Sequence, residues 1–283
     1  MTTTLVEPPM ASVREKWPAF ALIGFSTGVL SGLLGIGGAA ILIPGMVELL
    51  RVPQHKAHGT SLMVMIPAAA LAAVVYAQGE QMNWPLVILY SVASMVGATL
   101  GARLMTRISA PTLKKLFGAF LLFVAIRMLI PIGVPETHPA ALATDPVLLG
   151  AQGVLGLFAG VMSGLLGIGG GQILIPGMVF LFGVDQKLAQ GISLAFIVPT
   201  AFSGALTHYR RHNVVPRIGL LLIPGALLGG LLGAALAQQL PSDVLKQLFG
   251  VFLVYVGVRM IWPKFWGRAF GTIAHLGRAG APW

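Results

Sequence analysis

Apolar residues in this chain of 283 residues gather into segments that short polar and charged stretches interrupt. In order, the segments cover 18–34, 39–50, 60–78, 85–106, 113–131, 147–166, 171–182, 192–209, 217–237 and 245–262. A helix needs about 20 apolar residues to cross a bilayer, and most of these segments approach that length. The pattern therefore predicts an all-α polytopic membrane protein.

Two of the segments, 39–50 and 171–182, are too short to cross a membrane. At ~1.5 Å per residue each extends only ~18 Å, against a hydrocarbon core of ~30 Å. Each follows a glycine cluster, and glycine permits positive φ and close approach of two backbones. We expect re-entrant hairpins, in which one helix enters the membrane and the short helix leaves by the same side. The alternative is that the glycines only allow helices to pack closely.

The glycine cluster belongs to an internal repeat. The sequence Ser-Gly-Leu-Leu-Gly-Ile-Gly-Gly occurs at 31–38 and again at 163–170, an offset of 132 residues. The same offset matches Ile-Leu-Ile-Pro-Gly-Met-Val at 41–47 with 173–179. The chain is therefore one unit duplicated and fused, with a hairpin and three transmembrane helices in each copy. This divides it into a cytoplasmic N-terminal lead, a first membrane repeat, an extracytoplasmic linker, a second membrane repeat and a cytoplasmic C-terminal tail, at 1–17, 18–131, 132–146, 147–262 and 263–283.

Composition agrees with a membrane location and excludes several kinds of function. Charged residues make up 9% of the chain, against roughly 25% in soluble domains, and the mean hydropathy is +0.88. The net charge of +10 comes from clusters between apolar segments, which indicates anchoring at a bilayer surface rather than binding of nucleic acid. The absence of cysteine excludes disulfides and thiol chemistry, and we expect no cofactor and no metal site.

Lysine and arginine residues set the expected orientation, because cytoplasmic loops of membrane proteins are enriched in them. In the first repeat the loops at 51–58 and 103–115 are rich in these residues, whereas the loop at 79–84 has none. In the second repeat the equivalents of the rich loops are poor, and 209–217 carries three arginines. The repeats are therefore predicted to be inverted relative to each other in a bacterial-type inner (plasma) membrane, with both termini cytoplasmic. Inverted repeats with broken helices are the architecture of secondary transporters.

The predicted hairpin tips offer an anion site at the centre of the membrane. The first N–H groups and the positive dipole end of each short helix would point there, and helix N-termini bind anions. Polar side chains nearby would add hydrogen bonds. The candidate substrate-binding residues are Gly37, Gly38, Ala39, Gly169, Gly170, Gly171, Gln172, Ser61, Ser193, His58 and Gln190. Ser61 and Ser193 have an alternative role as N-caps of the helices that follow.

The distribution of carboxylates argues against a cation carrier. Of the eight acidic residues only Glu48 lies in an apolar segment, and acidic residues at membrane depth normally mark cation and proton pathways. Arg127 and Arg259 match under the repeat and lie inside the last segment of each copy. They have two interpretations: side chains that reach toward the interface, or cations that attract anions at the two mouths of the pathway.

The repeated Gly-Leu-Leu-Gly-Ile-Gly-Gly motif is followed by Gly59-Thr60-Ser61 in one copy and by Gly191-Ile192-Ser193 in the other. This pattern resembles the TauE/SafE sulfite exporter family, and the resemblance extends from about residue 20 to residue 262. It implies a permease for small sulfur-containing anions such as sulfite or organosulfonates, often moved outward. The second copy has Gln172 where the first has Ala40, so the site is expected to be asymmetric.

We therefore expect a secondary transporter that exports a small sulfur-containing anion by alternating access around the two hairpins, and not an enzyme. An anion channel or a carrier of another small organic acid is the alternative. An intramembrane enzyme is disfavoured, because no nucleophile or acid–base cluster recurs in the repeats. The expected partners are the anionic substrate and the lipid bilayer; proton or ion coupling and a homo-oligomer are left open.

Overall fold

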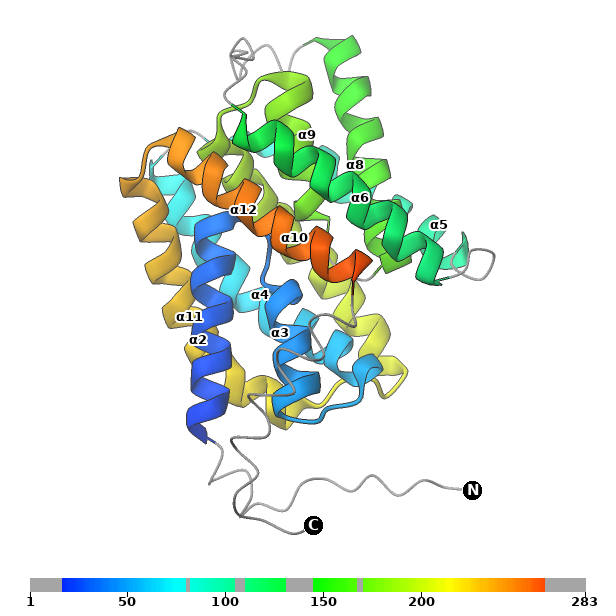
Figure 1. Ribbon diagram of the computed structural model, residues 1–283, viewed down its shortest axis with the longest axis vertical. Coiled ribbons are helices and arrows are strands. Elements are labelled where there is room, and N and C mark those ends of the chain that lie inside the picture. The colour runs from blue at the N-terminus through cyan, green and yellow to red at the C-terminus, as the bar shows by residue number, and fades with distance from the viewer. Residues whose placement is uncertain (1–16, 80–81, 105–109, 131–144, 167–169, 263–283) are drawn as a thin grey trace.

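A computed structural model describes residues 17–79, 82–104, 110–130, 145–166 and 170–262 (Figure 1). These residues form helices and connecting turns, with no strand among them. The helices are α2 (Trp17–Leu34), α3 (Ala39–Pro44), the π-helix η1 (Gly45–Leu49), α4 (Gln54–Gly79), α5 (Trp84–Leu104), α6 (Ala110–Leu129), α8 (Pro146–Leu166), α9 (Gly171–Phe182), α10 (Gln186–Arg210), α11 (Pro216–Gln239) and α12 (Ser242–Ile261). The predicted all-α class is confirmed.

The helices match the apolar segments of the sequence one by one. Within the described ranges, seven helices are long and apolar enough to cross a membrane, namely α2, α4, α5, α8, α10, α11 and α12. The helix expected at 113–131 is present as α6, but it carries Lys114, Lys115 and Arg127 and is not one of the seven. The segments that were too short to span form α9, with 12 residues, and the pair α3 and η1.

Each short helix folds back alongside the helix that precedes it. In the first repeat, a Cβ atom added at Gly38 would lie 2.5 Å from Cγ2 of Thr27, and one added at Gly45 would lie 2.9 Å from Cγ2 of Ile23. Later residues of α3 and η1 thus contact earlier residues of α2. The second repeat has the same order of contacts, Gly170 with Ala159 and Gly177 with Leu155. Both units therefore contain a helical hairpin, and its re-entry into a membrane stays a prediction.

Glycine is required in the turn between α2 and α3. Gly35, Gly37 and Gly38 have φ values of +73°, +75° and +76°. A residue with a Cβ atom loses roughly 1–2 kcal/mol in this left-handed region, because Cβ approaches the following carbonyl oxygen. The sequence prediction that the cluster permits positive φ is therefore correct for the first repeat.

Helices of one repeat pack mainly against helices of the other. α2 packs along α11 and α8 along α5, while α4 packs against α10 and α6 against α12. The 132-residue offset exchanges the first two pairs and maps the other two onto themselves, so the fold has approximate two-fold symmetry. Glycines bring α2 and α11 close together: a Cβ atom at Gly28 would overlap the carbonyl oxygen of Ala226, and one at Gly229 that of Phe25. Close packing therefore explains the glycines between α2 and α11, while the glycines of the first tip serve the turn.

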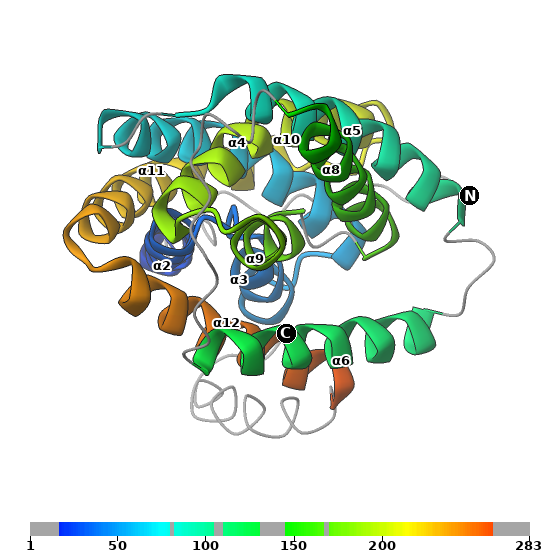
Figure 2. The same cartoon turned by 90° about the horizontal axis from the view of Figure 1, so that it is seen from above.

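The equivalent helices α4 and α10 run in opposite directions. Gly59, near the start of α4, contacts Asn213 just beyond the end of α10. Gly79, the last residue of α4, contacts Gln238, whose carbonyl oxygen accepts a 3.0 Å hydrogen bond from Lys187 near the start of α10. Figure 1 shows α3 in the lower half of the molecule and α9 in the upper half, and Figure 2 shows both near the centre of the bundle. Inverted repeats would have this arrangement in a membrane; the inversion itself stays a prediction of the charge pattern.

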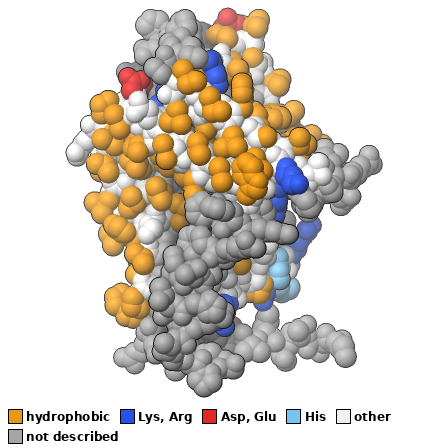
Figure 3. Space-filling model, in the orientation of Figure 1, with side chains coloured by type: hydrophobic (Ala, Val, Ile, Leu, Met, Phe, Trp, Pro, Cys, Tyr) orange, Lys and Arg blue, Asp and Glu red, His pale blue; other side chains and the backbone are white. Residues whose placement is uncertain are grey.

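The outer surface of the bundle is apolar. Figure 3 shows hydrophobic side chains across the face that α6, α12 and α11 form. Many large apolar side chains are more than half exposed, among them Leu22, Ile88, Phe123, Leu228 and Val251. A surface of this kind suits hydrocarbon rather than water, and together with the seven apolar helices it identifies a multi-pass membrane protein.

Single cysteines can test the inversion, because the chain has no native cysteine. We expect cysteines at His55 and Asn213 to react with an impermeant maleimide only from the cytoplasmic side, since both lie in stretches rich in basic residues, at the start of α4 and after the end of α10. Cysteines at Asn83 and Asp243 should react only from the opposite side. Labelling of right-side-out and of inside-out vesicles measures the accessibility of each cysteine from the two sides of the membrane. Labelling of positions 83 and 213 from the same face would replace the inversion by a parallel duplication.

Candidate substrate-binding site

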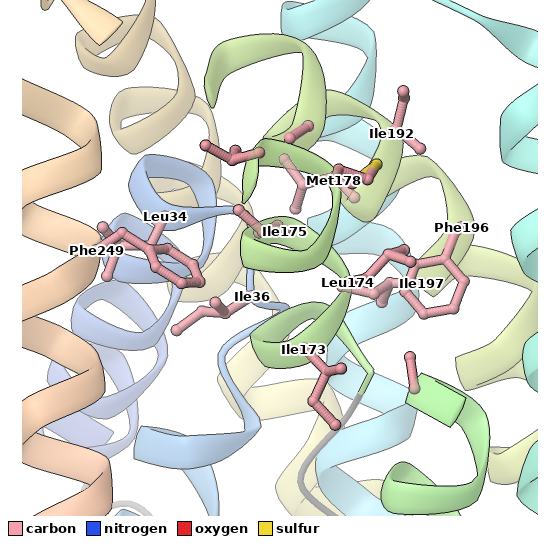
Figure 4. Packing of buried hydrophobic residues seen from close by; sticks show 14 of the residues in the cluster. Leu34, Ile36, Ile173, Leu174, Ile175, Met178, Ile192, Phe196, Ile197 and Phe249 are labelled. Atoms are coloured by element: carbon pink, nitrogen blue, oxygen red, sulfur yellow. The ribbon is translucent and has the colours of Figure 1, made fainter. Parts of the chain in front are cut away.

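The first hairpin tip meets the start of α9 at the centre of the bundle. A Cβ atom added at Gly171, the first residue of α9, would lie 3.2 Å from the carbonyl oxygen of Gly35 and 3.4 Å from Cα of Ile36. Figure 4 shows Ile36, from the loop after α2, beside Ile173 and Ile175 of α9. The structure thus places the tip of the first hairpin against the start of the short helix of the second.

Polar side chains of α4 and α10 hold the first tip. Ser193 Oγ donates a 2.8 Å hydrogen bond to the carbonyl oxygen of Gly35. The hydroxyl of Tyr76 lies 3.0 Å from the carbonyl oxygen of Gly32 and 2.9 Å from Oε1 of Gln190. All five residues are buried. The end of α2 is therefore fixed by side chains from both repeats.

The side-chain amide of Gln190 is not fully satisfied by these contacts. A phenolic hydroxyl has one proton, so Tyr76 cannot donate to Gly32 and to Gln190 at the same time. A half-turn of the amide, which exchanges its oxygen and nitrogen, would let Gln190 donate to Tyr76 while Tyr76 donates to Gly32. In the structure, Nε2 of Gln190 has no partner among the described residues. In either orientation one polar atom of this amide is left for a ligand.

Gln172 presents a second unpaired amide beside the tips. It is the second residue of α9 and is 1% exposed, and neither Oε1 nor Nε2 has a partner within the described part of the chain. A buried polar group left unpaired costs ~1–3 kcal/mol, so such a group normally meets a ligand or an ordered water. The positive N-terminal end of α9 lies at the same place. Together these groups can donate hydrogen bonds to an anion.

The tip residues of the two repeats differ in backbone geometry. Gly37 and Gly38 are left-handed, and Ala39 after them is buried. Gly170 instead has φ of −75°, an ordinary helical value, and the ring of Phe196 lies 2.8 Å from a Cβ atom added there. Gly170 therefore does not adopt the positive φ that glycine permits, because the chain already has helical backbone one residue before α9. Gly169 lies outside the described residues.

The N-cap alternative for Ser61 and Ser193 is wrong, because both serines lie seven residues into helices that begin earlier than expected, at Gln54 and Gln186. Asp185 caps α10 instead, by accepting hydrogen bonds from two backbone N–H groups, those of Lys187 at 2.7 Å and Leu188 at 3.4 Å. Ser61 donates a 2.8 Å hydrogen bond to the carbonyl oxygen of His58 in its own helix. Of the candidate side chains on α4 and α10, the structure therefore brings Gln190 and Ser193 to the first tip.

Arg127 and Arg259 occupy equivalent positions but have different partners. Arg259 forms a 2.8 Å ion pair with Glu48 of η1. Arg127 lies over the ring of Phe180, with its guanidinium carbon 5.8 Å from the ring centroid, and Phe180 is the repeat equivalent of Glu48. The approximate symmetry thus extends to these side chains. Because Glu48 offsets the charge of Arg259, Arg127 carries more of any attraction for anions, and that role stays a prediction for both.

Sequence reasoning missed Tyr76 and Thr27. The hydroxyl of Thr27 is buried beside Gly38 and has no partner among the described residues. Under the repeat, Tyr76 corresponds to His208 and Thr27 to Ala159, so neither forms a repeated motif. The available signal was a polar side chain within an apolar segment, which in membrane proteins is often functional.

The site is built from neutral groups. The two hairpins, 18–50 and 147–182, contain one charged residue, Glu48. The buried side chains that carry polar atoms among the described residues belong to serine, threonine, glutamine and tyrosine. No cluster of three metal-ligating side chains occurs in the ranges that the structure describes. An anion at the tips would therefore be held by dipoles and hydrogen bonds rather than by a counter-charge.

Replacing Gln172 by alanine is expected to weaken anion binding by on the order of 1–2 kcal/mol, because one hydrogen-bond donor to the anion is lost. Titration of the purified protein with labelled sulfite or methanesulfonate measures the change. Gln152→Ala is the matched control: its Oε1 accepts a 3.0 Å hydrogen bond from Tyr90, so its loss should lower stability and leave affinity unchanged. Equal affinities of the Gln172 variant and the wild type would remove this residue from the site.

Comparison with known proteins gives a consistent family assignment. The sequence model of the family described as Sulfite exporter TauE/SafE matches residues 3–128 and 153–282. A probable membrane transporter protein, YunE of Bacillus subtilis, is 24% identical over 261 residues, covering 85% of this chain and 96% of that protein. Probable membrane transporter proteins of Xylella fastidiosa and Methanocaldococcus jannaschii are each 28% identical, over 247 and 260 residues, and cover 85% and 86% of this chain and 92% and 95% of their own lengths.

Proposed function

This chain belongs to the TauE/SafE sulfite exporter family, and on that premise we propose that it is a secondary transporter that exports a small sulfur-containing anion such as sulfite or an organosulfonate. Membership makes the protein a membrane transporter. The substrate, the outward direction and the mechanism are the proposal. The related proteins named above are described only as probable membrane transporters.

The observation that carries the proposal is the unpaired amide of Gln172 at the N-terminus of α9. Both of its polar atoms are buried without a partner among the described residues, and the preceding residue, Gly171, lies against the carbonyl of Gly35 and the Ser193 hydroxyl that binds it. A helix N-terminus favours negative charge, and amide N–H groups match the oxygens of a sulfonate or sulfite group. A cation would find no carboxylate here, since the hairpins contain only Glu48.

A site made of neutral groups favours a singly charged anion. The cost of taking an ion out of water rises with the square of its charge, whereas its attraction to fixed dipoles rises only in proportion to the charge. We therefore expect hydrogen sulfite and monosulfonates to be better substrates than doubly charged anions of similar size.

Burial of the site supports a carrier that exposes it to one side at a time. Gln172, Gln190 and Ser193 are all closed off from the surface. A conducting channel would keep a continuous wet path past these residues. Each hairpin also packs on a helix of the other repeat, α2 on α11 and α8 on α5, so movement of such a pair of helices would carry the tip of its hairpin with it.

Uptake by proteoliposomes tests the proposal. We expect saturable uptake of labelled sulfite and methanesulfonate, faster than that of ethane-1,2-disulfonate, and little uptake of a carboxylate such as propionate. Preloading the liposomes with unlabelled substrate should accelerate uptake, because counterflow is a property of carriers. Transport of the carboxylate alone would remove the sulfur assignment, and uptake without saturation or counterflow would favour an anion channel.

A further inference from the structure

Two equivalent rows of polar side chains run along α4 and α10. The row on α10 consists of Gln186, Gln190 and Ser193, whose spacings of four and three residues place them on one face of the helix. The 132-residue offset maps them onto three residues of α4, which are Gln54, His58 and Ser61. We call these sets the α10 row and the α4 row.

The rows start at opposite ends of the molecule. α4 and α10 are antiparallel, so their first residues, Gln54 and Gln186, lie far apart. Along α10, Ser193 binds the carbonyl of Gly35 at the first hairpin tip, and Gln190 packs against the same glycine. Gln186 lies one turn farther out, beside Lys187, which binds the end of α11. The α10 row thus runs from one end of the bundle to the first hairpin tip, and the 132-residue offset predicts the same course for the α4 row from the other end.

The two rows differ in exposure. Gln186, Gln190 and Ser193 are 3%, 0% and 0% exposed. In the α4 row, Gln54 is exposed and His58 is half-buried, whereas the innermost residue, Ser61, is buried. The α10 row is therefore closed to solvent, and the α4 row is open as far as His58.

Unpaired amides distinguish the closed row from ordinary packing. Both polar atoms of Gln186, and Nε2 of Gln190, have no partner among the described residues. An apolar side chain could fill the same space without the loss of hydration that a buried, unpaired amide suffers. These groups would be satisfied in a conformation that opens the row to water or to an anion.

We propose that the two rows are the two halves of the substrate's path, with Gln54 and Gln186 as its outermost contacts, and that the structure is closed on the α10 side and open toward the start of α4. The proposal rests on the transport function above. Amide and hydroxyl groups at intervals of one turn would pass a sulfonate or hydrogen sulfite group from donor to donor without a fixed charge. The alternative is that the glutamines are buried for packing and bind ordered water.

Single cysteines in the full chain separate the two explanations. Gln186→Cys and Gln190→Cys probe the α10 row, and Gln54→Cys and His58→Cys probe the α4 row. Leu188→Cys and Ala195→Cys are matched controls, because both residues are buried on the opposite face of α10. Each variant is treated in sealed vesicles of either orientation with an impermeant methanethiosulfonate that carries a sulfonate or, in parallel, a trimethylammonium group.

We expect the α10-row cysteines to react only from the side where α10 begins and the α4-row cysteines only from the other side. At position 190 the sulfonate reagent should react at least about tenfold faster than the cationic one, and the control cysteines should react from neither side. The proposal is overturned if positions 186 and 190 react no faster than 188 and 195, or if the charge of the reagent makes no difference. Cysteine labelling does not require transport. If the expected labelling occurs in a protein that transports no sulfur-containing anion, the proposed substrate is wrong but the proposed path is still supported.

A second variant gives an independent reading. Gln186→Leu keeps the volume of the side chain and removes its unpaired amide. It should raise the unfolding temperature and lower the transport rate at least about tenfold, because the α10 row loses an unsatisfied group when it is closed and a hydrogen-bond donor when it opens. Higher stability with unchanged transport would show that Gln186 is only a packing residue.

Discussion

Replacing Gly38 by valine is expected to abolish transport. Gly38 has φ of +76°, and a Cβ atom there would lie 2.5 Å from Cγ2 of Thr27 and 3.2 Å from its carbonyl oxygen. The left-handed backbone alone costs a residue with a Cβ atom ~1–2 kcal/mol, and valine, being branched at Cβ, adds a steric conflict with α2. The first tip would therefore move away from α9 and disturb the anion site. Proteoliposome uptake measures the loss, and size-exclusion chromatography shows that the variant is folded.

Gly170 supplies the matched comparison, because it is the repeat equivalent of Gly38 with a different backbone. Its φ is −75°, and the nearest obstacle is the tip of the Phe196 ring, which can shift. Gly170→Ala should therefore reduce transport far less than Gly38→Ala, although valine at 170 is expected to impair it. Equal activities of the two alanine variants would show that the left-handed turn is not needed for function.

Replacing Gly28 by alanine is expected to destabilise the whole protein by ~1–3 kcal/mol or more. The new Cβ atom would overlap the carbonyl oxygen of Ala226 and lie 2.7 Å from the backbone nitrogen of Gly230. Both obstacles are backbone atoms of α11, so only separation of α2 from α11 relieves the overlap. Since this pair joins the two repeats, thermal unfolding in detergent, followed by tryptophan fluorescence, should occur at a clearly lower temperature.

A control for this prediction is Gly150→Ala in α8. A Cβ atom at Gly150 meets no atom within 4 Å, and alanine in a helix is favoured over glycine by up to about 1 kcal/mol. This variant should be as stable as the wild type or more so. The same direction of change in both variants would mean that close packing of α2 against α11 does not limit stability.

The sequence determined the class and the repeat unit because both depend on local properties. Long apolar runs specify spanning helices, and 12 residues at 171–182 cannot span, whatever surrounds them. An exact duplication at a fixed offset specifies two equivalent units without knowledge of their contacts. The tip glycines and Gln172 could be selected in the same way, since a break in an apolar run and a lone amide are visible in one dimension.

The helix boundaries and the partners of charged side chains depended on contacts between residues that are distant in the sequence, so the sequence alone did not determine them. The helices α4 and α10 extend outward to Gln54 and Gln186 through polar residues that hydropathy excluded, so the serines expected at helix starts lie inside. The repeat offset shows that Glu48 and Phe180 are equivalent. Only the folded chain shows that Arg259 pairs with Glu48 and that Arg127 lies over Phe180.

Only the tertiary structure decided how the repeated motifs fold and which side chains complete the site. Gly38 and Gly170, the last glycines of two identical clusters, have different backbones, and Gly38 packs against Thr27 whereas Gly170 packs against Phe196. Tyr76 belongs to the site through a contact with Gln190, 114 residues away, that no spacing indicates. Local composition sets where a helix forms and breaks, whereas the energy of a buried polar group depends on whether a partner from elsewhere in the chain reaches it.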